Sequence, residues 1–129
     1  MILDSNIIIY SNQPGYELLL LWLQKPENTF EVSAISKIEV LGFPKLSIQD
    51  KADFDVFFAN TTTLPITSEL IDEAIRLRQQ RKRSLGDAVI AATALVHHLP
   101  VLTNNVDDFL TIDRLTVIPL GTILAGKTT

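Results

Sequence analysis

The sequence predicts an α/β domain whose central parallel sheet of four to five strands is covered by helices on both faces. Short apolar runs alternate with longer segments of helical pattern along the chain. Strands that are repeatedly separated by helices form parallel sheets with both faces covered. In addition, residues 88–96 are almost all apolar or small, which is typical of a helix buried against such a sheet.

Five short apolar or β-branched runs, each ended by a turn residue or a charge, are expected to be strands. They are residues 1–3, 29–33, 61–64, 99–102 and 115–118. The segments between them predict helices at residues 17–23, 36–41, 48–60, 67–83 and 84–96, with short helices after residue 4 and within residues 103–109. We expect residues 121–129 to form a loose C-terminal tail.

The composition limits the class of protein. With 129 residues, 47% of them hydrophobic and 20% charged, the chain is expected to form one domain, residues 1–129. The absence of cysteine excludes disulfides, thiolate metal sites and thiol catalysis. No apolar run approaches the roughly 20 residues that span a bilayer, and no signal peptide pattern opens the chain, so we expect a soluble, cytoplasmic protein. The net charge of −4 means that binding a polyanion would need a local basic patch.

Acidic residues are predicted to gather at one edge of the sheet. In open α/β sheets, ligands bind beyond the carboxyl ends of the strands. Asp4 follows the first strand, Glu39 lies on the helix after the second, and Asp87 begins the helix before the fourth. Asn105 and Asp108 follow the fourth strand. Acids that are far apart in sequence are therefore expected at the same edge.

Each acid also has a simpler interpretation as a helix cap. Asp4 could cap the short helix that follows it. Three more acids follow a potential capping residue at the spacing of a capping box: Glu39 after Ser36, Asp87 after Ser84 and Asp108 after Asn105. Taken singly, these patterns favour capping. Taken together, three or four carboxylates at one edge would repel, and some would stay protonated unless a cation intervened.

A hard divalent cation fits this set of residues. Mg²⁺ and Mn²⁺ prefer oxygen ligands, and the chain offers no thiolate or plausible imidazole cluster that would favour zinc. An ion held by a few carboxylates keeps several waters, some of which a substrate phosphate can replace. Such an ion activates water as a nucleophile and offsets charge on the leaving oxygen.

Four segments together resemble the motifs of PIN-domain proteins, and most closely those of the small VapC-type toxins of bacterial and archaeal toxin–antitoxin pairs. The segments are Leu3-Asp-Ser-Asn-Ile7, Ile35-Ser-Lys-Ile-Glu-Val-Leu41, Leu85-Gly-Asp-Ala-Val-Ile-Ala-Ala-Thr-Ala94 and Leu102-Thr-Asn-Asn-Val-Asp-Asp-Phe109. Each motif is weak alone, but the ordered set is specific and covers essentially the whole chain. The resemblance implies a Mg²⁺- or Mn²⁺-dependent endoribonuclease, usually a homodimer, that is kept inactive by a cognate antitoxin.

The resemblance also implies which residues form the site. Asp4, Glu39 and Asp87 match the first three acidic positions of the family. Ser5 stands where these proteins often have Thr, and Asn6 matches a family Asn.

The fourth acidic position is where the chain departs from the pattern. Many PIN domains have an Asp two residues after the Thr that corresponds to Thr103, and here that residue is Asn105. We therefore expect Asp108 to be the fourth acid, with Asn105 as a neutral ligand or water-holding residue. The missing charge favours one well-held ion over two.

The leading hypothesis is hydrolysis of RNA phosphodiester bonds by a water that the metal activates. One alternative is a non-catalytic PIN-like module that binds protein or RNA and uses its acids only as caps, and Asn105 gives it some weight. A phosphatase with Asp4 as nucleophile ranks lower, because such enzymes usually have a second Asp where Asn6 stands.

Two further features have several interpretations. The basic residues Arg76, Arg78, Arg81, Lys82 and Arg83 could contact RNA phosphates, form a solvated helix end or contact an antitoxin. Three phenylalanines, Phe54, Phe57 and Phe58, could form a groove for an antitoxin helix.

Overall fold

The computed structural model describes residues 1–125 and has five parallel strands. One sheet has the order β1-β4-β5, from β1 (Ile2–Leu3), β4 (Val101–Thr103) and β5 (Val117–Pro119). A second sheet pairs β2 (Val32–Ser33) with β3 (Thr63–Leu64). A single parallel bridge between Ile2 and Glu31 joins the two sheets, so the strands follow the spatial order β3-β2-β1-β4-β5. Each of the five predicted segments contains a strand, and the predicted parallel α/β architecture is confirmed.

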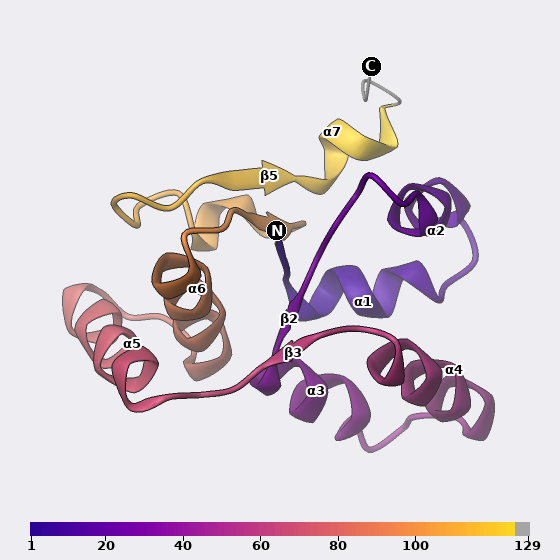
Figure 1. The fold of residues 1–129 in the computed structure, drawn as a ribbon, viewed down its shortest axis with the longest axis horizontal. Helices are drawn as coiled ribbons and strands as arrows, with labels where there is room; N and C mark the ends of the chain where they lie inside the picture. The colour runs from indigo at the N-terminus through magenta and orange to yellow at the C-terminus, as the bar shows by residue number, and fades with distance from the viewer. Residues whose placement is uncertain (126–129) are drawn as a thin grey trace.

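Helices cover the strands on both sides. In chain order they are α1 (Ser5–Ser11), α2 (Glu17–Gln24), α3 (Ala34–Leu41), α4 (Ile48–Ala59), α5 (Ser68–Gln80), α6 (Leu85–His97), a 3₁₀ turn η1 (Val106–Asp108) and α7 (Leu120–Leu124). Figure 1 shows α5 and α6 packed side by side at one end of the molecule, with α1 to α4 at the other. Two apolar cores correspond to these halves, one built largely on α5 and α6 and the other largely on α1, α2 and α4. None of the helices within residues 1–125 is long and apolar enough to cross a membrane.

Helix α6 has the longest run of buried residues of the described helices. Every residue from Ala88 to Ala94 is buried, including the polar Thr93, whose hydroxyl donates a 2.7 Å hydrogen bond to the carbonyl of Val89. Small side chains allow α6 to pack against both α5 and the strands. The helix ends at His98, which adopts a left-handed conformation with φ of 55°. The predicted buried helix is confirmed.

Two predicted boundaries are wrong. The amphipathic helix expected over residues 67–83 ends at Gln80, and Arg81 is fully extended, so residues 81–84 form a loop between α5 and α6. The loose tail expected over residues 121–129 begins instead as α7, because Leu120 and Ile123 are one helical turn apart and both are buried. The remainder of that tail, residues 126–129, lies outside the described residues.

Candidate active site

Asp4 is the most buried acid of the predicted set, with 5% of its surface exposed. It directly follows β1 and caps α1, where Oδ1 accepts a 2.8 Å hydrogen bond from the Ser5 amide. Oδ2 accepts a 2.7 Å hydrogen bond from the hydroxyl of Thr103, the last residue of β4. The predicted capping role of Asp4 is therefore confirmed, but only one of its two oxygens serves the helix.

The environment of Asp4 disfavours its charge. Burial raises its pKa from 3.8 to about 6, the hydrogen bonds from Thr103 and Ser5 oppose this rise, and the nearby carboxylates of Asp87 and Glu39 add to it. Like charges affect one another in this way only when they lie close together. Asp4 thus lies in a small acidic group and is not an isolated cap.

Glu39 reaches Asp4 through a serine that both residues contact. The Ser5 hydroxyl lies 2.7 Å from Glu39 Oε1, to which it donates, and 2.9 Å from the hydroxyl of Ser36. The expected capping box of Ser36 and Glu39 is wrong, because Ser33 caps α3 by accepting a hydrogen bond from the Ile35 amide. Ser36 lies inside the helix and is fully buried. Its role is to support Ser5, and Glu39 is left available at the edge of the sheet.

Gly86 allows α6 to approach Glu39. A Cβ atom at Gly86 would lie 2.6 Å from Oε2 and 3.1 Å from Oε1 of Glu39, closer than side chains tolerate. The carboxylate therefore occupies the space that any other residue at position 86 would need. Local sequence patterns did not single out Gly86 as part of the site. Glycine in the first turn of a helix lowers helix stability, so its presence indicates that another group packs closely against this position.

Asp87 and Asp108 extend the acidic group. The Ser84 hydroxyl accepts a 3.1 Å hydrogen bond from the Asp87 amide, so the predicted Ser84 cap is confirmed. Burial raises the pKa of Asp87, the Ser84 hydroxyl lowers it, Asp108 and Glu39 raise it, and Arg83 lowers it. Glu39 lies against Gly86, the residue before Asp87, and Asp108 is close enough to Asp87 to raise its pKa.

Asn105 does not cap the turn that carries Asp108, so that capping prediction is wrong. The Asn105 side chain makes no capping hydrogen bond. The backbone N–H of Asn105 donates a 2.9 Å hydrogen bond to the Thr103 hydroxyl. Thr103 consequently accepts from Asn105 and donates to Asp4. Asp107 and Asp108 are both exposed at η1.

The chemistry of these side chains fits a hard divalent cation. The donors are carboxylates, hydroxyls and amides, which are the ligands of Mg²⁺ and Mn²⁺. Asn6 Oδ1 is buried and has no hydrogen-bond partner among residues 1–125, so one more oxygen donor is free beside Asp4. In the described part of the chain, no three acidic or imidazole side chains converge closely enough to surround an ion in this conformation. In this conformation the acidic side chains within residues 1–125 do not converge on a single point.

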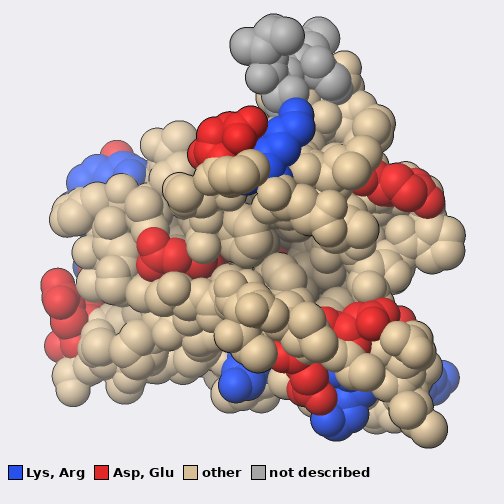
Figure 2. Space-filling view, turned by 45° about the vertical axis from the view of Figure 1, so that its right-hand side comes forward, with Lys and Arg blue, Asp and Glu red and all other residues tan. Residues whose placement is uncertain are grey.

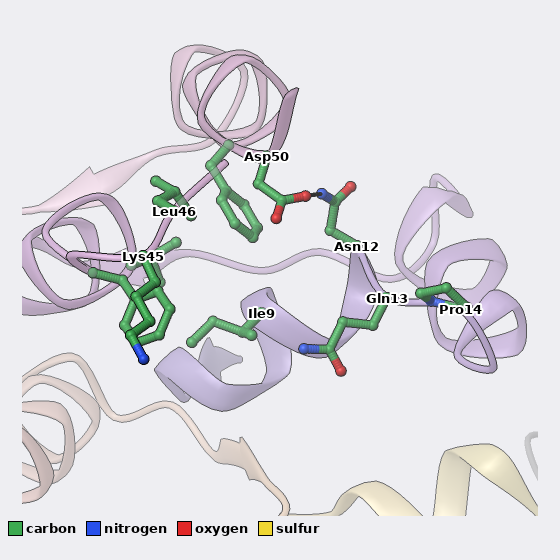
Figure 3. Close-up of a pocket in the computed structure, with 10 residues that line it drawn as sticks. Ile9, Asn12, Gln13, Pro14, Lys45, Leu46 and Asp50 are labelled. Atoms are coloured by element: carbon green, nitrogen blue, oxygen red, sulfur yellow. Dashed lines mark hydrogen bonds between the residues drawn. The ribbon is translucent and has the colours of Figure 1, made fainter. Parts of the chain in front are cut away.

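A separate apolar hollow of about 440 Å³ lies between α1, α4 and the loop that follows α3. Its lining includes Ile9, Phe43, Leu46 and Phe54, and none of the four predicted acids. Figure 3 shows Asn12 and Asp50 pointing toward each other at its rim, where the Asn12 amide donates a 3.0 Å hydrogen bond to Asp50.

The fold and the site together define a small parallel α/β domain in which Asp4 follows β1 and Glu39 reaches toward it through Ser5. The sequence profile of the PIN domain matches residues 1–115. The chain belongs to the PIN-domain family. Domains of this family are generally nucleases, which supports a hydrolase.

Solved structures agree with this assignment. The chain is similar to a chain of a toxin–antitoxin complex from Klebsiella pneumoniae, with 26% identity and a TM-score of 0.72 over 91% of this chain and 94% of that one. It shares its fold with VapBC2 from Rickettsia felis, which was solved bound to a promoter DNA fragment (23% identity, TM-score 0.74, 92% and 96% covered). The fold also matches VapBC-1 from nontypeable Haemophilus influenzae (23% identity, TM-score 0.71, 92% and 96% covered). No curated protein sequence matches the chain significantly.

Proposed function

We propose that this protein is a metal-dependent endoribonuclease and the toxin component of a VapBC-type toxin–antitoxin pair. Membership of the PIN-domain family supports a nuclease, and the similarity to chains of toxin–antitoxin complexes supports the toxin role. The observation that carries the proposal is local. Asp4 and Glu39, 35 residues apart, are connected through Ser5, and Gly86 admits Glu39 beside Asp87.

The proposed ligands of Mg²⁺ or Mn²⁺ are Asp4, Glu39, Asp87 and Asp108, acting directly or through water, with Asn105 as a neutral helper. When bound, the ion would make water a better nucleophile and offset charge on the phosphate and the leaving oxygen. Its positive charge would also favour the ionised form of Asp4, whose pKa is raised mainly by burial and to a smaller extent by Asp87 and Glu39.

The residues around these acids have positioning roles. Thr103 and the Ser5 amide fix both oxygens of Asp4, so the carboxylate cannot rotate freely. The Ser5 hydroxyl restrains Glu39. The Ser84 cap holds the first turn of α6, which carries Asp87. Rigid mounting of this kind keeps acidic ligands in productive geometry without a rearrangement for each turnover.

A cognate antitoxin is the proposed protein partner, and we propose that it binds in the apolar hollow beside α1 and α4. Phe54 lines this hollow and Phe57 lines a neighbouring one. Phe54 and Phe58 are both buried in the core, so the three phenylalanines do not form one open groove. Exposed apolar side chains adjoin the hollow, with Phe43 53% exposed and Ile48 93% exposed. Apolar surface of this kind marks interaction sites.

We also propose a homodimer. The exposed leucines of α2, Leu18, Leu20 and Leu21, provide an apolar face that a second copy could cover. Light scattering on the purified chain tests this directly, and a mass near the 14.4 kDa of one chain at all concentrations would contradict it.

The nuclease proposal is tested by cleavage of single-stranded RNA with Mg²⁺, with Mn²⁺ and with EDTA. Cleavage should require a divalent ion, and Asp4→Asn or Asp87→Asn should abolish it while the protein stays folded. Asp107→Asn is the matched control for Asp108→Asn, because both acids are exposed and adjacent on η1. Asp108→Asn should reduce cleavage and Asp107→Asn should not. Retained activity in both Asp4→Asn and Asp87→Asn would remove the proposal.

A non-catalytic PIN-like binding module is the second candidate. It is favoured by Asn105, which places a neutral side chain where many PIN domains have an acid. Titration calorimetry with Mn²⁺ separates the two candidates. The nuclease requires binding at or below millimolar metal, and a chain without such binding would fit the module.

A further inference from the structure

Arg83 has two buried nitrogen atoms with no hydrogen-bond partner. It lies in the loop of residues 81–84, directly before Ser84, the cap of α6. Its Nε and Nη1 are shielded from solvent and have no partner among residues 1–125. Burying a charged donor without a partner is costly, so an unsatisfied guanidinium is unusual in a folded protein. Arg83 as a whole is only partly buried, so a turn of its side chain would bring these nitrogens to a partner that arrives from outside.

The position of Arg83 relates it to the acidic site. Asp87 lies one turn along α6. Burial and the neighbouring Arg81 lower the pKa of the Arg83 guanidinium, and Asp87 partly opposes this lowering. Within residues 1–125, however, the two side chains form no ion pair and no hydrogen bond. Arg83 is therefore attracted to the edge of the site without being neutralised there.

Two other arginines near this loop do have partners. Arg76 is paired with Glu73, and the Arg81 guanidinium donates a 2.9 Å hydrogen bond to the Thr111 hydroxyl. The contact from Arg81 ties the loop to the segment that follows η1, which carries Asp108. Arg81 thus connects the loop to the segment after η1, and Arg83 is the cation of this loop whose buried nitrogens have no partner among residues 1–125.

A polyanion that approaches this site meets mainly negative charge. The chain has a net charge of −4, and Figure 2 shows several acidic patches on one face, with Lys and Arg side chains mostly near its margins. An RNA phosphate beside the acids therefore needs a local cation in addition to the metal ion. Guanidinium groups suit this role because their fixed donors match phosphate oxygens.

We propose that Arg83 binds a phosphate oxygen of the RNA substrate next to the acidic site and so positions the strand for cleavage. The inference rests on the proposed nuclease function and deepens it. Arg83 and Asp87 form no ion pair within residues 1–125, so the guanidinium is available to a phosphate.

The test measures RNA binding without cleavage. A fluorescent single-stranded RNA is titrated in Mg²⁺ with Asp4→Asn protein, and then with Asp4→Asn protein that also carries Arg83→Gln or Lys82→Gln. Lys82 is the matched control, because it is exposed, adjacent on the same loop and equal in charge. Arg83→Gln should raise the dissociation constant by about tenfold or more, and Lys82→Gln by less than about threefold. The slope of log affinity against log salt should fall by about 0.7 for Arg83→Gln.

A second measurement distinguishes phosphate binding from a structural role. Mn²⁺ affinity, measured by calorimetry with Asp4 intact, should be unchanged or tighter in Arg83→Gln, because a cation near the acids has been removed. Equal RNA binding by the Arg83 and Lys82 variants, or weaker Mn²⁺ binding by Arg83→Gln, would overturn the inference. If Arg83→Gln does not fold, Arg83→Lys takes its place and should raise the KM for RNA cleavage while leaving kcat within about threefold.

The two proposals fail in different ways. If the unaltered protein cleaves no RNA with either metal ion, the nuclease proposal fails and the inference about Arg83 fails with it. If the unaltered protein cleaves RNA and the Arg83 variants keep the same KM, only the inference about Arg83 fails.

Discussion

The hydroxyl of Thr103 donates a 2.7 Å hydrogen bond to Oδ2 of Asp4 and so joins the ends of the neighbouring strands β4 and β1. Thr103 is completely buried and Asp4 nearly so. The same hydroxyl accepts a hydrogen bond from the amide of Asn105. One side chain therefore orients the central acid and also fixes the start of the loop that carries Asp108.

Thr103→Val should destabilise the protein and perturb Asp4. Valine keeps the shape of threonine but removes the hydroxyl, so the free energy of unfolding should fall by about 1–3 kcal/mol. The pKa of Asp4 should rise further, because the Thr103 hydroxyl lowers it. Urea denaturation measures the first effect and NMR titration of the Asp4 carboxyl the second. Thr103→Ser keeps the hydroxyl and should retain most of the stability, and an equal loss in both variants would contradict this explanation.

Asp4→Asn should stabilise the metal-free protein at pH 7. Burial raises the pKa of Asp4 to about 6 from 3.8, so the folded state binds more protons than the unfolded state between these values. The contribution of this group to stability therefore falls as pH rises through that window. Above it, the ionised carboxylate destabilises the folded state. The neutral amide removes a cost on the order of 3 kcal/mol, from which lost hydrogen bonding must be subtracted. We expect a net gain of about 1–2 kcal/mol in EDTA.

The pH dependence of this gain provides its control. At pH 4 the carboxyl of Asp4 is already neutral in the folded protein, so the gain should disappear, and the lost hydrogen bonding should leave Asp4→Asn no more stable than the unaltered chain. Asp107→Asn, at an exposed acid, should change stability little at either pH. A stabilisation that is equal at pH 4 and pH 7 would mean that charge burial is not its cause.

Mn²⁺ affinity should fall as the pH is lowered through about 6. The ion must displace the proton that Asp4 holds below its pKa of about 6, and metal binding to carboxylates releases such protons. Below that pH the apparent affinity should drop by roughly tenfold per pH unit if one proton is displaced. Calorimetry in buffers of different ionisation enthalpy measures both quantities. A flat affinity between pH 5 and pH 7 would mean that Asp4 is not a ligand.

Much of the acidic edge was predictable because the rule for parallel sheets depends only on the order of strands and helices along the chain. That rule predicted Asp4 and Asp87 at one edge, and the Ser84 cap was predictable because its motif is local. The cap of α3 was not, because Ser33 and Ser36 both lie near its start and only packing against Ser5 decides between them. The metal-ligand roles of these acids stay predictions.

Contacts between segments that are far apart in the sequence could not be predicted from local patterns. The strands have only two or three residues each, so their division into two sheets joined by one bridge depends on helix packing. The loose tail was predicted from weak local signals, yet burial of Leu120 and Ile123 orders α7. Gly86 has a role only because Glu39 arrives from another helix.

Gly86→Ala tests that role, and it should impair the site without unfolding the protein. Alanine normally stabilises a helix by up to about 1 kcal/mol relative to glycine, but its Cβ would lie 2.6 Å from Oε2 of Glu39. Because Glu39 is an exposed, flexible side chain, the carboxylate should move away, and Mn²⁺ affinity and RNA cleavage should fall about tenfold or more. Gly121→Ala is the matched control, since it lies on α7 with nothing within 4 Å of an added Cβ. Thermal unfolding should show both variants folded, and a Gly86→Ala protein that binds Mn²⁺ as tightly as Gly121→Ala would show that Glu39 does not need its present position.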